Sequence, residues 1–203
     1  MDTNIKKKIV VLDGADNTGK SKLSENLARE INAIVIQQPS PSNSVGFLRN
    51  VVKKEQNIEP FARQLLHSIS HTVDFYETML ISENTIVMDR CYISALVYGE
   101  LCGLNQNQLN LIHNIHKSIY SRLNNLFDVH IFILTKKQPF RTNDESIYEQ
   151  VLNWQDINMI YQKLSRTCDK YFFLENENID LIDLDQFNSI DNIVSHIRNC
   201  IKL

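Results

Sequence analysis

The segment Gly14–Ser21 constrains the fold of this chain more than any other feature, because its sequence, GADNTGKS, fits the pattern G-x-x-x-x-G-K-[ST]. An apolar run, Ile9–Leu12, precedes this segment, and apolar residues at helical spacing, Leu23, Leu27 and Ile31, follow it. A strand, a glycine-rich loop and a helix in this order form a P-loop, which binds phosphate at the start of the helix. The context therefore predicts an α/β fold with a phosphate site.

The glycine-rich segment predicts a site for a nucleoside triphosphate with Mg²⁺. Gly14 and Gly19 let the backbone approach phosphate oxygens, so that successive N–H groups converge on them. Lys20 adds a positive charge at the β- and γ-phosphates, and the Ser21 hydroxyl is a ligand for Mg²⁺. A glycine turn without a ligand is the alternative interpretation. The predicted ATP-binding residues are Gly14, Ala15, Asp16, Asn17, Thr18, Gly19, Lys20 and Ser21.

A second apolar strand ends in a carboxylate at Ile86–Asp89. In P-loop proteins an acid at the end of a neighbouring strand lies beside the magnesium ion, so Asp89 is a predicted metal ligand and catalytic residue. An aspartate in this position is also common as a helix cap. Arg90 follows directly, and a cation beside a magnesium-binding acid is expected where a second phosphate must be held in line with the first.

Short apolar runs alternate with segments of helical periodicity along the whole chain. This alternation predicts a mostly parallel, doubly wound sheet with helices on both faces. The candidate strands are residues 9–12, 34–36, 86–88, 129–134 and 181–184. The later candidate helices are residues 59–82, 105–122, 145–170 and 189–201, and Pro60 suits the first turn of the first of them.

The composition limits the cellular context and the partners. The chain has 203 residues, which predicts a single domain over residues 1–203. Its 21 basic and 24 acidic residues give a net charge of -3, so we expect no binding to nucleic acid. The start of the chain predicts neither a leader nor a membrane span. A cytoplasmic location is expected, with reduced thiols at Cys91, Cys102, Cys168 and Cys200.

Three blocks of the sequence resemble the thymidylate kinase family: VVLDGADNTGKS, QLLHSISHTVD and IVMDRCYISALVYGELCGL. The resemblance implies a five-stranded parallel sheet, a lid over ATP, a homodimer and transfer of the γ-phosphate of ATP to dTMP. By matching position, it implies that Asp16 binds the 3′ hydroxyl of the acceptor, that Arg90 binds its phosphate and that Tyr98 packs near its sugar. The acceptor is expected under the helices at residues 59–82 and 92–102.

The middle block departs from the family pattern at two histidines. Members usually have a phenylalanine that stacks on thymine and, four residues later, an arginine that bonds the base, where this chain has His67 and His71. Residues four apart share one helix face, so both imidazoles should contact the same object, be it a base, a metal or solvent. The resemblance favours the acceptor base and an altered base specificity. An ordinary imidazole titrates near pH 6.5, which predicts acceptor affinity that changes between roughly pH 5.5 and 7.5.

Two further departures concern arginines. The loop with Pro39 and Pro41 lacks the arginine that members often carry there, and Arg49 or Arg63 could replace this phosphate contact. Asn17 stands where some members have a P-loop arginine, and members without it supply one from the lid. The lid is expected at about 135–150, where Arg141 is the predicted transition-state cation. The predicted catalytic residues are thus Lys20, Asp89 and Arg141.

Two other functions remain open from the sequence. A deoxynucleoside kinase would need a carboxylate base near the end of the first strand, and Asp13 stands there. A nucleotide-binding protein without catalysis would explain the missing phosphate contact. Transfer to a monophosphate needs no general base, because the attacking phosphate oxygen is already ionised; orientation and charge stabilisation would accelerate it.

Overall fold

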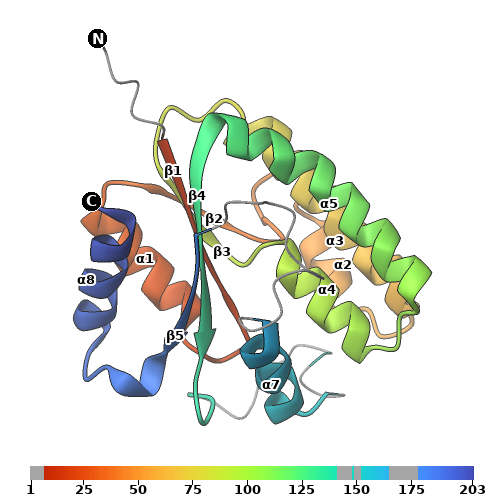
Figure 1. Cartoon of the computed structure of the whole chain (residues 1–203). Coiled ribbons are helices and arrows are strands. Elements are labelled where there is room, and N and C mark those ends of the chain that lie inside the picture. Colours follow the sequence, from red (N-terminus) through yellow and green to blue (C-terminus); the bar gives the residue numbers. More distant parts are fainter. Residues whose placement is uncertain (1–6, 141–147, 149–151, 165–177) are drawn as a thin grey trace.

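The computed structural model describes residues 7–140, 148, 152–164 and 178–203. Five strands form one parallel sheet in the order β2-β3-β1-β4-β5, as expected (Figure 1). They are β1 (Lys7–Gly14), β2 (Ile34–Gln37), β3 (Ile86–Asp89), β4 (Phe127–Thr135) and β5 (Asn178–Asp183).

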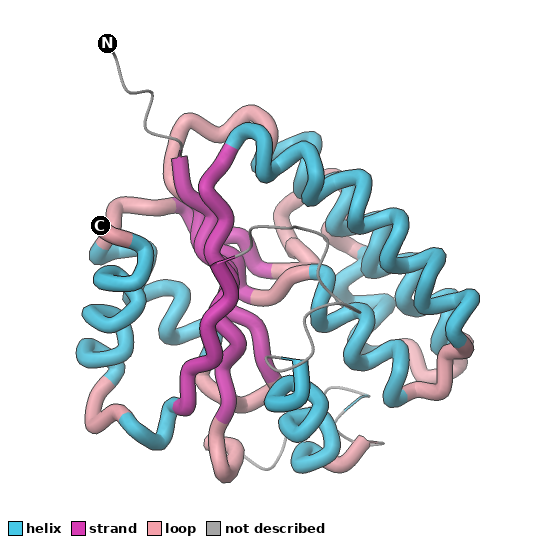
Figure 2. The backbone as a smooth tube through the Cα atoms, in the orientation of Figure 1, coloured by secondary structure: helices cyan, strands magenta, loops and turns pink. Residues whose placement is uncertain are grey.

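Helices cover both faces of this sheet, which confirms the doubly wound architecture. Helices α1 and α8 lie on one face and α3, α4 and α5 on the other, with the twisted strands between them (Figures 1 and 2). The helices are α1 (Lys20–Glu30), α2 (Leu48–Lys54), α3 (Pro60–Asp74), α4 (Tyr92–Leu101), α5 (Gln106–Leu126), α7 (Trp154–Leu164) and α8 (Ile190–Ile201). A π-helical turn, η1 (Phe75–Met79), extends α3, and a 3₁₀ turn, η3 (Leu184–Gln186), follows β5.

The central strand β1 sends alternate side chains into two cores. Ile9 and Val11 pack with residues of α4 and α5, whereas Val10 and Leu12 pack with residues of α1 and α8. Successive side chains of a strand point to opposite faces, so a continuous apolar run is what a strand buried on both faces requires. All four side chains are fully buried.

The order of the strands brings two loops together at the carboxyl edge of the sheet. Strand β1 pairs in parallel with β3, and Leu12 lies opposite Asp89. The backbone N–H of Arg90 donates to the carbonyl oxygen of Leu12 at 2.9 Å, which extends the pairing by one residue. In open parallel sheets ligands bind at this edge, where neighbouring connections run to opposite faces.

The helix expected at residues 145–170 is not continuous, because the chain leaves the helical conformation at residues 152–153. Asn153 accounts for the break: its side-chain oxygen accepts from the N–H of Gln155 at 2.9 Å, and its carbonyl accepts from Ile157 at 3.2 Å. Asparagine favours this capping role, and α7 accordingly begins at Trp154. The short helix α2 was not predicted.

In the part of the chain that the structure describes, no helix combines the length and apolarity needed to cross a bilayer.

Candidate active site

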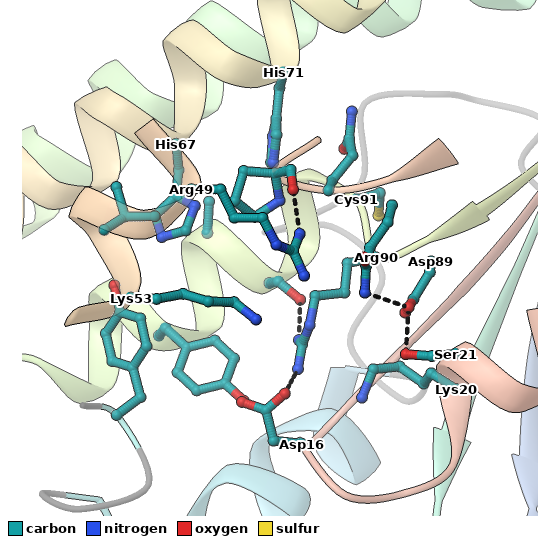
Figure 3. Close-up of a pocket in the computed structure, with 18 of the residues that line it drawn as sticks. Asp16, Lys20, Ser21, Arg49, Lys53, His67, His71, Asp89, Arg90 and Cys91 are labelled. Carbon is teal, nitrogen blue, oxygen red and sulfur yellow. Dashed lines mark hydrogen bonds and ion pairs between the residues drawn. The ribbon is translucent and has the colours of Figure 1, made fainter. Parts of the chain in front are cut away.

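A cavity of about 430 Å³ opens at the carboxyl edge of the sheet, between the glycine-rich loop, α2, α3 and α4 (Figure 3). It brings together predicted residues that lie far apart in the sequence. Those that line it are Asp16, Asn17, Gly19, Lys20, Ser21, Arg49, His67, His71, Asp89, Arg90 and Tyr98. Gly14, Ala15 and Thr18 belong to the same loop but do not line the cavity.

Both motif glycines occupy positions where a Cβ atom would be crowded by neighbouring atoms. Gly14 has φ +152, and a Cβ atom there would lie 2.3 Å from the carbonyl oxygen of Leu134 in the neighbouring strand. Gly19 has φ +90, and its Cβ atom would lie 3.0 Å from the ring of Phe140. The loop is therefore held between β4 and the segment after it, with its backbone toward the cavity.

The Lys20 ammonium is almost fully buried at the floor of the cavity. It donates to the carbonyl oxygen of Ala15 and to the hydroxyl of Thr18 at 3.3 Å. Burial and the nearby charge of Arg90 lower its pKa from 10.5 to about 8, although Asp16, Asp89 and Asp13 act in the opposite direction. A cation held away from water attracts an anionic ligand more strongly than an exposed one.

Ser21 and Asp89 form a pair of oxygen ligands at the same end of the cavity. The Ser21 hydroxyl donates to the Asp89 carboxylate at 2.6 Å, and Gln37 donates to the same oxygen at 3.3 Å. A hydroxyl and a carboxylate are hard oxygen donors, which suit Mg²⁺, and this ion commonly takes one or two protein ligands and keeps several waters. The residues present therefore fit the predicted metal.

Arg90 links the two ends of the cavity. Its guanidinium forms an ion pair with Asp16 and donates to the Ser94 hydroxyl at 2.7 Å (Figure 3). The Tyr98 hydroxyl donates to the second Asp16 oxygen at 3.1 Å. Burial raises the pKa of Asp16, but Arg90 and Lys20 outweigh it and lower the pKa, so this carboxyl is ionised at neutral pH.

Asp13 lies beneath the cavity and is fully buried. Its carboxylate accepts hydrogen bonds from the Ser94 hydroxyl at 2.6 Å and from the Tyr161 hydroxyl at 2.9 Å. It also accepts from the backbone N–H groups of Gly14 at 2.8 Å and Cys91 at 3.0 Å. The carboxylate therefore joins the ends of β1 and β3, and it does not line the cavity.

Helix α2 places two cations in the cavity, Arg49 and Lys53 (Figure 3). They are four residues apart and therefore lie on one helix face. Arg49 also donates to the carbonyl oxygen of Pro39, which fixes its direction. Arg63 has a different role: its buried guanidinium donates to the carbonyl oxygen of Val52 in α2 and to those of Glu55 and Ile58 in the loop after it. It does not line the cavity.

His67 and His71 both line the cavity from α3, which agrees with the expectation that they face one object. Burial, and to a smaller extent the proximity of His71 and Arg63, lowers the pKa of His67 to about 3. Burial lowers the pKa of His71 to about 4. Both imidazoles are therefore neutral across pH 5.5–7.5, which removes the titration on which the expected change of acceptor affinity depended.

Sequence reasoning missed several residues of the cavity wall, among them Lys53, Gln64 and Tyr148. Gln64 donates to the Tyr148 hydroxyl at 2.8 Å, and this hydrogen bond links Tyr148 to α3. The Tyr148 ring lies 6.5 Å from that of His67 and 4.8 Å from that of Tyr98. The spacing of Arg49 and Lys53 was the available signal for Lys53, but the prolines before them suggested a loop. Arg141 and most of the expected lid lie outside the described residues.

Together, a parallel sheet of this order, a P-loop and a charged cavity at its carboxyl edge define a P-loop kinase. A sequence profile of the thymidylate kinase family matches residues 12–183. The chain belongs to the thymidylate kinase family, whose members are kinases.

Relatives and solved structures agree with this assignment. A probable thymidylate kinase of Methanococcus aeolicus is 24% identical over 182 residues, covering 84% of this chain and 88% of that protein. A second, from Methanococcus vannielii, is 25% identical over 173 residues and covers 81% of each. The thymidylate kinase structure from Candida albicans has a TM-score of 0.68 at 18% identity, covering 98% of this chain and 93% of that one. The corresponding structure from Ehrlichia chaffeensis has a TM-score of 0.63 at 14% identity, covering 98% and 100%.

Proposed function

We propose that this protein transfers the γ-phosphate of ATP to the phosphate of dTMP. The observation that carries the proposal is a single cavity with two chemically different ends. Lys20, Ser21 and Asp89 stand at one end, and Arg49 and the two histidines of α3 at the other. Arg90 lies between these ends, where two phosphates would meet (Figure 3).

At the donor end, the backbone N–H groups of the loop and the Lys20 ammonium bind the β- and γ-phosphates. Ser21 and Asp89 hold Mg²⁺, which offsets the negative charge of the phosphates when bound. The attacking group is an ionised phosphate oxygen of the acceptor, so no residue has to remove a proton. The residues act by orienting the phosphates and stabilising charge.

At the acceptor end, Arg90, Arg49 and Lys53 bind the acceptor phosphate. Lys53 is an addition to the set expected from the sequence. Asp16 and Tyr98 bind the sugar, since an ionised carboxylate accepts a hydrogen bond from a hydroxyl. His67, His71 and Tyr148 surround the base. Three cations at this end offset the dianionic charge of a monophosphate, which an uncharged nucleoside would not need.

Two observations disfavour the alternative functions. A deoxynucleoside kinase would use Asp13 as its base, but this carboxylate is fully buried and already accepts several hydrogen bonds. The intact set of Lys20, Ser21 and Asp89 argues against a protein that has lost catalysis.

The remaining assignments are part of the proposal. Residues 135–150 close over ATP, and Arg141 stabilises the transition state. The enzyme is cytoplasmic, acts as one domain and forms a homodimer. Exposed Ile69 and Tyr76 support the dimer, because they are seven residues apart on α3 and its extension, and an exposed apolar helix face favours association. Sedimentation of the purified protein tests this state.

A panel of acceptors tests the proposed reaction. Each of dTMP, dUMP, dCMP, dGMP, dAMP and thymidine is incubated with ATP and Mg²⁺, and ADP release is measured against a reaction without acceptor. We expect dTMP to be phosphorylated. Use of thymidine alone would indicate the nucleoside kinase, and release of ADP with no acceptor would contradict both kinase interpretations.

A further inference from the structure

The imidazole of His71 is a buried polar group without a partner. It points from α3 into the cavity (Figure 3), and only 4% of its surface is exposed. Its Nδ1 atom is buried and has no hydrogen-bond partner among the described residues. Such groups are rare in folded proteins because they cost free energy. Because Nδ1 is shielded and unpaired, no neighbouring group of the described residues on that side of the ring fixes the position of the ring proton.

The neighbouring His116 is a histidine whose ring has a hydrogen-bond partner within the protein. The two rings are 5.1 Å apart, but His116 is fully buried and its Nε2 lies 3.2 Å from the hydroxyl of Ser68. A partner on one nitrogen decides where the proton resides. Within the described residues no hydrogen bond makes that choice for His71.

A neutral imidazole has one N–H donor and one acceptor nitrogen, and the two can exchange roles. Burial keeps His71 in this neutral form at physiological pH. The nitrogen that faces the ligand can therefore donate in one tautomer and accept in the other. An arginine in this place would be a donor only.

The edges of the pyrimidines differ in the group that such a residue would contact. Thymine presents a 4-oxo group, which accepts a hydrogen bond, and cytosine presents a 4-amino group, which donates one. We infer that His71 adapts its tautomer to either edge, so that the enzyme phosphorylates 4-amino pyrimidine deoxynucleotides such as dCMP as well as dTMP. This inference rests on the proposed monophosphate kinase activity.

The other residues around the proposed base site, His67 and Tyr148, do not discriminate between the two pyrimidines. The rings of His67 and Tyr148 are 6.5 Å apart and inclined by 30°, and both line the cavity. Aromatic rings stack on any base, because every base has a π-face. Stacking therefore contributes affinity without distinguishing the 4-oxo from the 4-amino edge, which leaves His71 to contact that edge.

The first test compares two acceptors that differ at the 4-position and share the 5-methyl group, dTMP and 5-methyl-dCMP. We expect their kcat/KM values to lie within about 100-fold, whereas a site with a fixed donor rejects the wrong partner by about 10⁴-fold or more. A larger ratio would overturn the inference. If ADP release is absent with both acceptors, the proposed function fails instead.

Binding is measured separately by the fluorescence of Trp154. This residue is the single tryptophan, and its Nε1 donates to the Asp16 carbonyl oxygen of the P-loop at 2.6 Å. Dissociation constants within about 100-fold for the two nucleotides support the inference without any turnover, and a wider separation contradicts it.

The second test changes the residue itself. In His71→Arg the donor-only side chain should raise the preference for dTMP over 5-methyl-dCMP by at least about tenfold. In His71→Gln the amide, which offers both a donor and an acceptor, should keep the preference near that of the unmodified enzyme. His113→Arg on α5, which does not line the cavity, is the matched control.

The tautomer can be observed directly in the unmodified enzyme, even if the variants fail to fold. Long-range ¹H–¹⁵N NMR spectra report which ring nitrogen of His71 carries the proton in each complex. We expect the proton on opposite nitrogens with dTMP and with 5-methyl-dCMP. The same protonated nitrogen in both complexes would overturn the proposed mechanism.

Discussion

Under the proposed function, the two ends of the cavity recognise their ligands by different means. The donor end uses backbone N–H groups together with the charges of Lys20 and Asp89, and a contiguous motif supplies most of it. The base end uses neutral side chains, His67 and His71, whose pKa values burial lowers to about 3 and 4. Charge and backbone geometry bind a phosphate of any nucleotide, whereas an uncharged imidazole responds to the hydrogen-bonding pattern of one base.

Under the proposed function, separate sets of residues therefore determine the reaction and the choice of acceptor. Removing charge at the donor end should stop the reaction for every acceptor. Changing the base end should redistribute activity among acceptors. The predictions below test this division, beginning with the largest effect.

Lys20→Ala should lower phosphoryl transfer by about 10³-fold for every acceptor, because it removes a buried cation at the phosphates. ADP release measures the rate, and the thermal unfolding midpoint shows whether the fold persists. Arg29→Ala on the same helix is the control, since Arg29 is exposed and does not line the cavity. Near-normal turnover of Lys20→Ala would contradict the kinase function.

Arg49→Gln should lower kcat/KM for the acceptor by about 30-fold, the order expected for one charge-assisted hydrogen bond, with little effect on the KM for ATP. Steady-state kinetics with either substrate varied separate the two parameters. Arg29→Gln, at an exposed position of α1, is the control. Arg63→Gln should instead lower the unfolding midpoint, because Arg63 holds the end of α2. Equal losses for both substrates would place Arg49 outside the acceptor end.

Acidification should destabilise the protein through its buried histidines. The folded-state pKa of His71 is lowered to about 4, so between pH 6.5 and 4 the unfolded chain binds a proton that the folded chain does not. His71 thus costs about 2 kcal/mol of unfolding free energy at pH 5 relative to pH 7.5. His71→Gln should remove this cost, as chemical denaturation at the two pH values can show.

Asp74 acts in the opposite direction and is the internal control for the acid effect. Burial raises the pKa of its carboxyl to about 6, so it favours folding as the pH falls from 6 toward 3.8. Because Asp74 is present in both proteins, its effect cancels in their difference. Parallel pH profiles for the enzyme and His71→Gln would show that His71 is protonated normally in the fold.

The smallest expected effect concerns substrate choice. The ratio of kcat/KM for dTMP and 5-methyl-dCMP should change by less than about twofold between pH 5.5 and 7.5, because His67 and His71 stay neutral in that range. Titration of the acceptor phosphates cancels in the ratio. A sigmoidal change centred near pH 6.5 would mean that an imidazole at the base end does titrate.

The sequence predicted the parts that depend on local pattern. The glycine-rich motif indicated the P-loop, and short apolar runs indicated the five strands. Asp89 and Arg90 follow one of these runs directly, which placed them at the carboxyl edge of the sheet beside the P-loop. The sequence did not predict α2, because Pro39 and Pro41 suggest a loop, nor the break at Asn153, where a cap outweighs helical periodicity. The sequence could not predict that His71 is neutral, because its pKa depends on burial against other parts of the fold, including His116 of α5.

The position of Gly14 has a consequence for how this protein can evolve. Its missing side chain faces the carbonyl oxygen of Leu134 at 2.3 Å, and that atom is main chain. Replacing Leu134 by any residue leaves the same oxygen in place, so a second mutation there cannot compensate for a larger residue at 14. Asn17 is less restricted: its φ of 58 lies in the left-handed region, which asparagine and aspartate tolerate as well as glycine. We therefore expect no other residue to be tolerated at position 14. A saturation library selected for activity should return glycine alone at this position.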